Sequence, residues 1–283
     1  MNIDAYCIRI GYTGARSPTL RVLREIARLH PLAIPFENLS VAAGGVPELA
    51  IDAVEAKLVG DSGQGGRGGY CYEQNALLQA ALVVLGFTVT GLSARVRYRL
   101  PPELAMPRSH MVLCVDLPEG RFLVDAGFGG LTLTAPVLMA TTGPQPTPHE
   151  LVRLVPAEGD QMLQAWLGDE WVDVYRFDLS PHLMADYEQQ NWHTATRPGA
   201  LFSNNLIAAR PVVGGRHTLY NRTLTWLPLG GSPERRPIES NSAGDASLRE
   251  VLQSVFGIIV NDADFVAISA VSARGQARNP SFG

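Results

Sequence analysis

One cysteine, one histidine and one aspartate occur in an order and in local contexts that could build an activated thiol nucleophile. Cys71 follows a glycine-rich stretch, His110 opens an apolar run, and Asp125 ends another. A thiol in the first turn of a helix lies among unpaired N–H groups at the positive end of the helix dipole, which favours the thiolate. We interpret Cys71 as the nucleophile, His110 as the general base and acid, and Asp125 as the residue that orients the histidine ring.

The elements that must position these residues are a helix and a hairpin. The helix after Cys71 is predicted from apolar residues at three- and four-residue steps, and it ends near Gly86. Its apolar face is predicted to contain Ala76, Leu77, Ala80, Ala81 and Val84. His110 and Asp125 lie on two strand-like runs joined by Pro118-Glu119-Gly120, a turn signal that predicts a hairpin. In a hairpin the two side chains could face each other near its open end.

The pattern along the chain predicts three segments. Residues 1–87 are expected to be helical, with Ser17-Pro18 as one helix start. Residues 88–190 carry short β-branched runs separated by turn residues, which predicts an antiparallel barrel or sandwich, with a helix from Ser180-Pro181 to about residue 190. Residues 191–283 are expected to be mixed α/β. Strands of the middle segment are predicted at residues 88–92, 94–100, 111–117, 122–125, 151–155, 162–167 and 171–177.

Composition excludes several classes of function. The chain has 283 residues, 46% of them hydrophobic and 18% charged, which is ordinary for a globular protein with a substantial core. A net charge of −4 without a basic run argues against a nucleic-acid partner. No apolar run reaches membrane-spanning length, and no signal-peptide pattern opens the chain. Three cysteines, an odd number, do not suggest a disulfide framework, so we expect a cytoplasmic protein.

Each of the three candidate residues also has a purely structural interpretation. Cys71 could be a buried structural cysteine, which remains our interpretation of Cys7 and Cys114. His110 could be a satisfied core histidine, and Asp125 could cap the turn that follows it. The combination of all three favours the catalytic interpretation. The other histidines lack metal-ligand spacing, so we expect no metal.

The stretch Gly63 to Gly68 formally matches the GxGxxG pattern of dinucleotide-binding sites. Such a site needs a strand directly before the glycines, within a βαβ unit. The preceding residues, 52–59, have a helical pattern instead. We therefore interpret the stretch as a loop that shapes the approach to Cys71.

Several motifs together resemble the arylamine N-acetyltransferase family. They are RGGYCYEQN at 67–75, the strand that begins with His110, and VDAGFGG at 124–130. RIGY at 9–12 and IPFENL at 34–39 match the pattern of the family as well. The resemblance covers about the first half of the chain, with the motifs in the right order and spacing.

This resemblance implies an α+β fold in three parts around a cysteine-peptidase-like catalytic core. The parts are an N-terminal helical bundle, an antiparallel β-barrel and a C-terminal α/β lid, at 1–87, 88–190 and 191–283. It implies transfer of acetyl from acetyl-CoA to an arylamine, arylhydrazine or arylhydroxylamine, by a ping-pong mechanism through an acetyl-cysteine. The partners would be coenzyme A and a small aromatic amine or hydrazine, in a monomer or homodimer that acts in xenobiotic metabolism.

The resemblance also implies roles for further residues. Ser109, Gly127 and Gly129 would contact the coenzyme, because the glycines let a pantetheine chain approach the backbone closely. The backbone N–H of Cys71 would donate to the oxyanion. The positions that line the acceptor pocket in that family are Phe36, Val96, Phe128 and Phe202, which would otherwise be read as core.

The same three residues serve other thiol chemistry, so alternatives remain. A papain-like or transglutaminase-like thiol hydrolase would cleave amides without coenzyme A. An amide synthase of the same family would close a macrolactam. A non-enzymatic binding module would require Cys71 to be unreactive toward thiol reagents at neutral pH.

Overall fold

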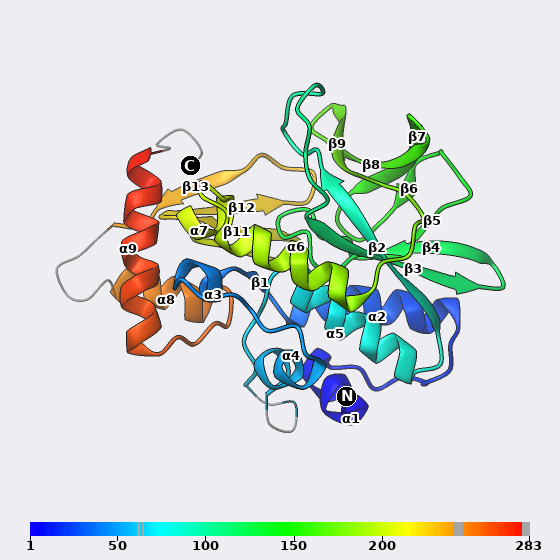
Figure 1. Ribbon diagram of the computed structural model, residues 1–283, viewed down its shortest axis with the longest axis horizontal. Helices are drawn as coiled ribbons and strands as arrows, with labels where there is room; N and C mark the ends of the chain where they lie inside the picture. The colour runs from blue at the N-terminus through cyan, green and yellow to red at the C-terminus, as the bar shows by residue number, and fades with distance from the viewer. Residues whose placement is uncertain (61–62, 64, 240–245, 279–283) are drawn as a thin grey trace.

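The structure is a computed structural model that describes residues 1–60, 63, 65–239 and 246–278 (Figure 1). Its helices are α1 (Ile3–Ile10), α2 (Leu20–Ala33), α3 (Leu39–Ala42), α4 (Ile51–Leu58), α5 (Cys71–Val84), α6 (Met184–Thr196), α7 (Leu201–Asn204), α8 (Ala246–Ser254) and α9 (Asp262–Arg278). Its strands are β1 (Phe36–Glu37), β2 (Thr88–Val96), β3 (His110–Leu117), β4 (Gly120–Val124), β5 (Val137–Leu138), β6 (Gln145–Pro146), β7 (Leu151–Ala157), β8 (Asp160–Leu167), β9 (Glu170–Phe177), β10 (Ile207–Val212), β11 (Gly215–Tyr220), β12 (Thr223–Pro228) and β13 (Glu234–Pro237).

The middle of the chain forms an eight-stranded antiparallel sheet in the order β5-β4-β3-β2-β9-β8-β7-β6. Its two end strands are joined by the side chain of Gln145, which donates to the Leu138 carbonyl at 2.9 Å and accepts from the Leu138 N–H at 2.8 Å. The sheet therefore curls into a nearly closed barrel, filled by side chains such as Leu92, Val112 and Leu163. Of the two predicted arrangements, barrel and sandwich, the structure has the barrel.

The C-terminal third forms a five-stranded sheet in the order β1-β10-β11-β12-β13. Its edge strand β1 comes from the N-terminal part of the chain and pairs Phe36 with Ala209. One face of the sheet packs on α8 and α9 through a buried cluster that contains Leu219, Leu252 and Ile268. The predicted α+β class is confirmed.

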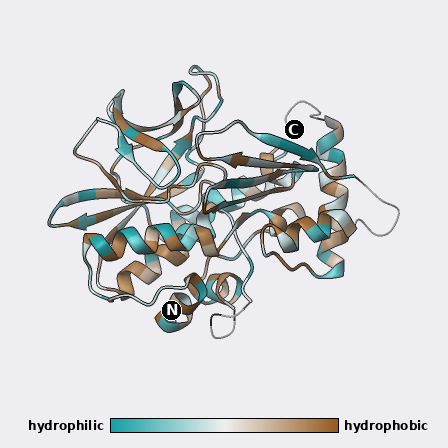
Figure 2. Cartoon of the chain, turned by 180° about the vertical axis from the view of Figure 1, so that it is seen from behind, coloured by the Kyte–Doolittle hydropathy of each residue, from teal (hydrophilic) through white to brown (hydrophobic). Residues whose placement is uncertain are grey.

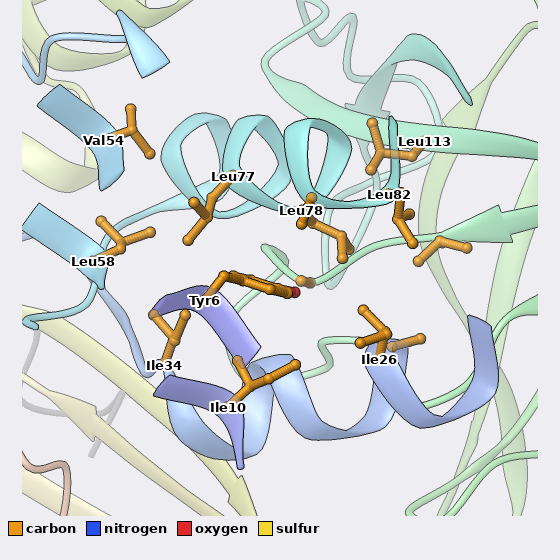
Figure 3. Close-up of a cluster of buried hydrophobic side chains, with 14 of the residues drawn as sticks. Tyr6, Ile10, Ile26, Ile34, Val54, Leu58, Leu77, Leu78, Leu82 and Leu113 are labelled. Atoms are coloured by element: carbon orange, nitrogen blue, oxygen red, sulfur yellow. The ribbon is translucent and has the colours of Figure 1, made fainter. Parts of the chain in front are cut away.

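Helix α5 lies in the largest core cluster, between α1, α2 and α4 on one side and the barrel on the other (Figure 3). Leu77, Leu78 and Leu82 of α5 meet Ile26 of α2 and Leu113 of β3 in this cluster. Each such side chain contributes roughly 1.5–3 kcal/mol when it is fully buried. Figure 2 shows hydrophobic and hydrophilic residues sharing the same outer helices, as expected of helices with one buried side.

The apolar face predicted for α5 is only partly correct. Leu77 and Ala81 are buried, but Val84 is 51% exposed. The first turns of the helix are buried all round, including the polar residues Glu73, Gln74 and Asn75. An apolar period of 3.6 residues identifies a helix that has one solvent-exposed face. It carries no such signal where a helix is buried on all sides, as in the first turns of α5.

Two predicted helix starts are wrong by a few residues. Helix α2 is capped by Thr19 rather than Ser17, since the Thr19 hydroxyl accepts from the Val22 N–H at 3.4 Å. Helix α6 begins at Met184 rather than after Ser180-Pro181, because the Asp186 carboxylate accepts from the Leu183 N–H at 2.8 Å. It then continues to Thr196, across the predicted boundary between 190 and 191.

The two strands predicted at 88–92 and 94–100 are one strand, β2, which ends at Val96. The three cysteines are unpaired and buried. Among the described residues, none of the helices has the length and apolar character needed to cross a bilayer.

Candidate active site

Cys71 is the first residue of α5, as the sequence predicts. The preceding N–H, on Tyr70, donates to the Glu73 carboxylate at 3.1 Å, so the helix N-terminus is closed by its own third residue. The thiol is 3% exposed, and Sγ lies 3.9 Å from the Ser109 carbonyl oxygen. Cys71 is therefore a buried residue of the first helical turn, whose N–H groups lack intrahelical partners.

The glycines before Cys71 let two backbone segments touch. A Cβ on Gly68 would lie 2.2 Å from the Pro35 carbonyl oxygen, which no side chain tolerates. Residues 61, 62 and 64 of the predicted glycine loop lie outside the described residues. The segment before that loop is α4, a helix, so the strand that a dinucleotide site requires does not precede it.

His110 is the first residue of β3, and Asp125 follows the last residue of β4. The two strands form the predicted hairpin, with Leu113 opposite Val124. Nε2 of His110 lies 2.7 Å from Oδ2 of Asp125, at the end of the hairpin away from its turn. Since Nε2 faces Asp125, Nδ1 is the ring nitrogen left to interact with Cys71, whose proximity also raises the pKa of His110.

The charges of this pair depend on each other. Burial alone would lower the pKa of His110, but the Asp125 carboxylate, followed by the contact with Cys71, raises it to about 10. Burial would raise the pKa of Asp125, but His110, Asn75 and the Gly127 N–H lower it. An imidazolium held against a carboxylate is therefore the stable form of the pair at neutral pH.

Asn75, one turn after Cys71, fixes Asp125. Its amide donates to Asp125 Oδ1 at 2.9 Å and to the Met111 carbonyl at 2.7 Å, and its oxygen accepts from the Ala126 N–H at 3.0 Å. Sequence reasoning gave Asn75 no role. The available signal was three consecutive polar residues, 73–75, inside an apolar helix pattern.

A second group of residues missed by the sequence is an ion-pair network under the loop before Cys71. Glu37 pairs with Arg67 at 2.9 Å and with Lys57 at 3.6 Å, and Lys57 pairs with Glu73 at 2.7 Å. Both carboxylates are at most 2% exposed. Two acids and two bases balance, so the buried charges are compensated while they hold Arg67 and the glycines in place.

The four predicted pocket residues form two groups, one beside Tyr70 and one beside His110. Phe36 and Phe202 have ring centroids 6.0 Å apart, and Phe202 lies 5.9 Å from the Tyr70 ring. Phe128 lies 5.2 Å from the His110 ring, and Val96 is paired with Tyr175, whose ring is 5.1 Å from His110. Phe36 is buried, whereas Val96, Phe128 and Phe202 are half-buried.

The three predicted coenzyme residues differ in their surroundings. Ser109 faces Cys71 through its carbonyl group. A Cβ on Gly127 would lie 2.7 Å from the Cys71 Cα, so packing against α5 alone explains this glycine. Gly129 has φ +82°, and a Cβ placed on it would lie 3.4 Å from the Phe36 ring.

Known proteins are similar to this chain over most of its length. The family model described as N-acetyltransferase matches residues 19–266. A protein of Escherichia coli strain K12 named arylamine N-acetyltransferase is 38% identical over 92% of this chain and 90% of its own length. A protein of the same name from Mycobacterium bovis is 36% identical over 93% of this chain and 91% of its own length.

Solved structures are similar to it as well. The arylamine N-acetyltransferase of Mycobacterium marinum superposes with a TM-score of 0.89 at 35% identity, covering 96% of this chain and 100% of that one. The same enzyme in complex with CoA superposes with a TM-score of 0.88 at 35% identity, over 95% and 99% of the two chains.

Proposed function

Because the chain belongs to the arylamine N-acetyltransferase family, and is thus an acyltransferase, we propose that it moves acetyl from acetyl-CoA to an arylamine through an acetylated Cys71. The observation that carries the proposal is the arrangement of three side chains at the start of α5. Asp125 holds one nitrogen of His110 at 2.7 Å, and the other nitrogen is left for the Cys71 thiol. This arrangement makes a nucleophile and stores its proton.

The first half-reaction loads the enzyme. In the resting enzyme His110 holds the proton of the thiol, and the Cys71 thiolate attacks the carbonyl carbon of the acetyl thioester. The backbone N–H of Cys71 donates to the oxyanion that develops. The bond to the coenzyme sulfur then breaks, and coenzyme A leaves with a proton from His110.

The second half-reaction discharges the enzyme. The amine nitrogen attacks the acetyl-cysteine and loses its proton to His110, and the Cys71 thiolate leaves as the amide forms. Burial of Cys71, His110 and Asp125 protects the thioester from water in the interval between the two steps. The cycle is ping-pong because the two substrates react in turn with the same sulfur.

The surrounding residues supply the two binding surfaces. The half-buried Val96, Phe128 and Phe202, together with Phe36, offer an apolar and aromatic lining suited to a flat acceptor. Ser109, Gly127 and Gly129 lie beside Cys71 and Phe36, on the path that we assign to the pantetheine chain. In this proposal the nucleophile comes from residues 1–87, and the histidine and aspartate come from residues 88–190. Residues 191–283 form the lid.

Intact mass spectrometry after brief mixing with acetyl-CoA and no acceptor tests the proposal. The wild type should gain a single acetyl group that an arylamine removes, and Cys71→Ala should gain none. Cys114→Ala is the matched control, because it replaces a buried cysteine of barrel strand β3 rather than of α5, and this variant should still be acetylated. A wild-type thiol that reacts with alkylating reagents but takes no acetyl from acetyl-CoA would contradict the proposal and favour a thiol hydrolase.

A further inference from the structure

A second buried histidine contacts α5 without taking part in the chemistry described above. His30 of α2 is completely buried, and both of its ring nitrogens have partners. Nδ1 lies 2.8 Å from the Tyr6 hydroxyl of α1, and Nε2 lies 2.8 Å from Oε1 of Gln74 in α5. Gln74 is in the first turn of the helix that starts with Cys71.

Gln74 determines the direction of both hydrogen bonds in the series Tyr6–His30–Gln74. The amide nitrogen of Gln74 faces three backbone carbonyls, of Pro35 at 2.8 Å, Gly69 at 3.2 Å and Ile34 at 3.3 Å. Carbonyls only accept, so the amide oxygen must face His30, and Nε2 of His30 must carry a hydrogen. Nδ1 is then an acceptor, which the Tyr6 hydroxyl satisfies as a donor.

The imidazole of His30 is neutral at pH 7. Burial lowers the pKa of His30 to about 4, although the Gln74 contact opposes the shift. A neutral imidazole can donate with one nitrogen and accept with the other, as this geometry requires.

The carbonyls that Gln74 binds belong to two segments of the candidate site. Gly69 leads to Cys71, and its carbonyl also accepts from the Glu37 N–H at 3.0 Å. Pro35 precedes Phe36, and its carbonyl also accepts from the Gly69 N–H at 3.3 Å. The Gln74 amide therefore joins the backbone that carries the nucleophile to the backbone that carries a pocket phenylalanine.

We propose that Tyr6, His30 and Gln74 are positioning residues for the acceptor amine, because they set the place of Phe36 relative to Cys71. This inference rests on the proposed function, since it assigns Phe36 to the acceptor pocket. It locates the main effect in the second half-reaction, because the acceptor ring would pack against Phe36, whereas the coenzyme path that we assign only borders Phe36 at Gly129. Asp125 and Ser109, which serve proton transfer and the coenzyme, have no hydrogen bond to Tyr6, His30 or Gln74 in the described residues.

Tyr6→Phe tests the inference with a minimal change, because the ring stays in the core (Figure 3) and only the hydroxyl is lost. Nδ1 of His30 then lacks a donor, and the histidine and Gln74 are free to reorient. The acetylated enzyme is prepared with acetyl-CoA and discharged either by an arylamine or by hydroxylamine, which has no ring to fit against Phe36. We expect the arylamine concentration for half-maximal discharge to rise about fivefold, the effect of losing one ordinary hydrogen bond.

Acetylation by acetyl-CoA and discharge by hydroxylamine should stay at wild-type rates in this variant. Tyr187→Phe is the matched control, because it removes another buried hydroxyl, which donates to the Leu92 carbonyl at 3.1 Å. It should leave the arylamine dependence unchanged. A purely structural role of Tyr6 would lower all the rates together through loss of folded enzyme, and that result would overturn the inference, as would an unchanged arylamine dependence.

A measurement on the wild type adds a second test that needs no variant. Nitrogen-15 NMR of the imidazole should show His30 as the Nε2–H tautomer at neutral pH, and the Nδ1–H tautomer would overturn the inference. A wild-type enzyme that takes no acetyl from acetyl-CoA would overturn the proposed function instead, and with it the premise of the inference.

Discussion

His110 and His30 are both buried imidazoles in contact with the first turns of α5, yet their ionisation is displaced in opposite directions. The pKa of His110 is raised to about 10, and the pKa of His30 is lowered to about 4. Burial acts in the same direction on both rings, since it disfavours the charged form. The difference comes from their partners, which are a carboxylate for His110 and a neutral amide and hydroxyl for His30.

The two sites therefore influence stability in opposite pH ranges. A raised pKa stabilises the folded protein below the unfolded pKa of about 6.5. For His110 that contribution is lost as the pH rises toward about 10. A lowered pKa stabilises the folded protein above about 6.5. For His30 the contribution is lost as the pH falls toward about 4. The His110 site stabilises the imidazolium, and the His30 site stabilises the neutral imidazole.

The largest effect is expected from making the His110 site resemble the His30 site. Asp125→Asn replaces the carboxylate by an amide, so the pKa of His110 should fall and its tautomer should no longer be fixed. We expect the rate of Cys71 acetylation to drop by roughly 10³- to 10⁴-fold. Rapid-quench mass spectrometry with acetyl-CoA measures this rate. Asp116→Asn is the control, because that exposed carboxylate pairs with Arg121 at 3.0 Å on the surface and should leave the rate unchanged.

The next effect is on stability in acid. Between pH 6.5 and 4 the unfolded chain takes up a proton on residue 30 that the folded chain resists, since the pKa of His30 is lowered to about 4. This difference amounts to about 3 kcal/mol of unfolding free energy. Urea titrations at several pH values should show that His30→Gln loses less stability than the wild type over this range. Parallel pH curves for the two proteins would mean that His30 is not held neutral.

A smaller effect is expected from removing a hydrogen bond to the Asp125 carboxylate than from replacing the carboxylate itself. Asn75→Ala removes a donor to Asp125 and leaves the Ala126 N–H without its acceptor. Hydrogen bonds to charged groups contribute about 1.5–3 kcal/mol, so acetylation should slow roughly 10- to 100-fold. The pKa of Asp125 should also rise, which moves the acid limb of the rate profile to higher pH. Gln164→Ala, whose amide contacts Arg153 and Asp173 instead, should change neither quantity.

The smallest effect is expected from removing one neutral partner of His30. Tyr6→Phe deletes a single buried hydrogen bond without leaving a charge unpaired, so the unfolding free energy should fall by about 1 kcal/mol. Tyr187→Phe should cost about the same amount, since it also deletes one buried hydroxyl contact. Urea unfolding at pH 7 compares the two. A loss several times larger in Tyr6→Phe alone would show that the His30 chain acts cooperatively, and would weaken the contrast with the charged site.

Much of this organisation could be predicted from local sequence. The start of α5 at Cys71, the hairpin that places His110 near Asp125, and the α+β class follow from turn residues, apolar periodicity and family resemblance. These features depend on residues close together in the chain. The helix starts at Ser17 and Ser180 were misplaced because a nearby Thr19 or Asp186 supplied a better cap, which spacing alone does not rank.

Contacts between residues that are far apart in the sequence could not be predicted from local patterns. Asn75 and Gln74 belong to the motif at 67–75, yet their partners Asp125 and His30 are distant in the sequence and meet them only in the folded protein. The ion pairs of Glu37 with Arg67 and Lys57 likewise join segments that no periodicity connects. Polar residues within an apolar helix were the one local sign that these positions are enclosed.

The sequence by itself determined the family, the class of fold and the order in which a thiol, an imidazole and a carboxylate enter the chain. The tertiary structure alone decided which of two buried histidines is positively charged. Both are ordinary histidines in apolar surroundings, and His30 meets its amide partner across 44 residues. A pKa depends on desolvation and on the charge within a few ångströms. Those distances exist only after α5 has packed against α2 on one side and the barrel on the other.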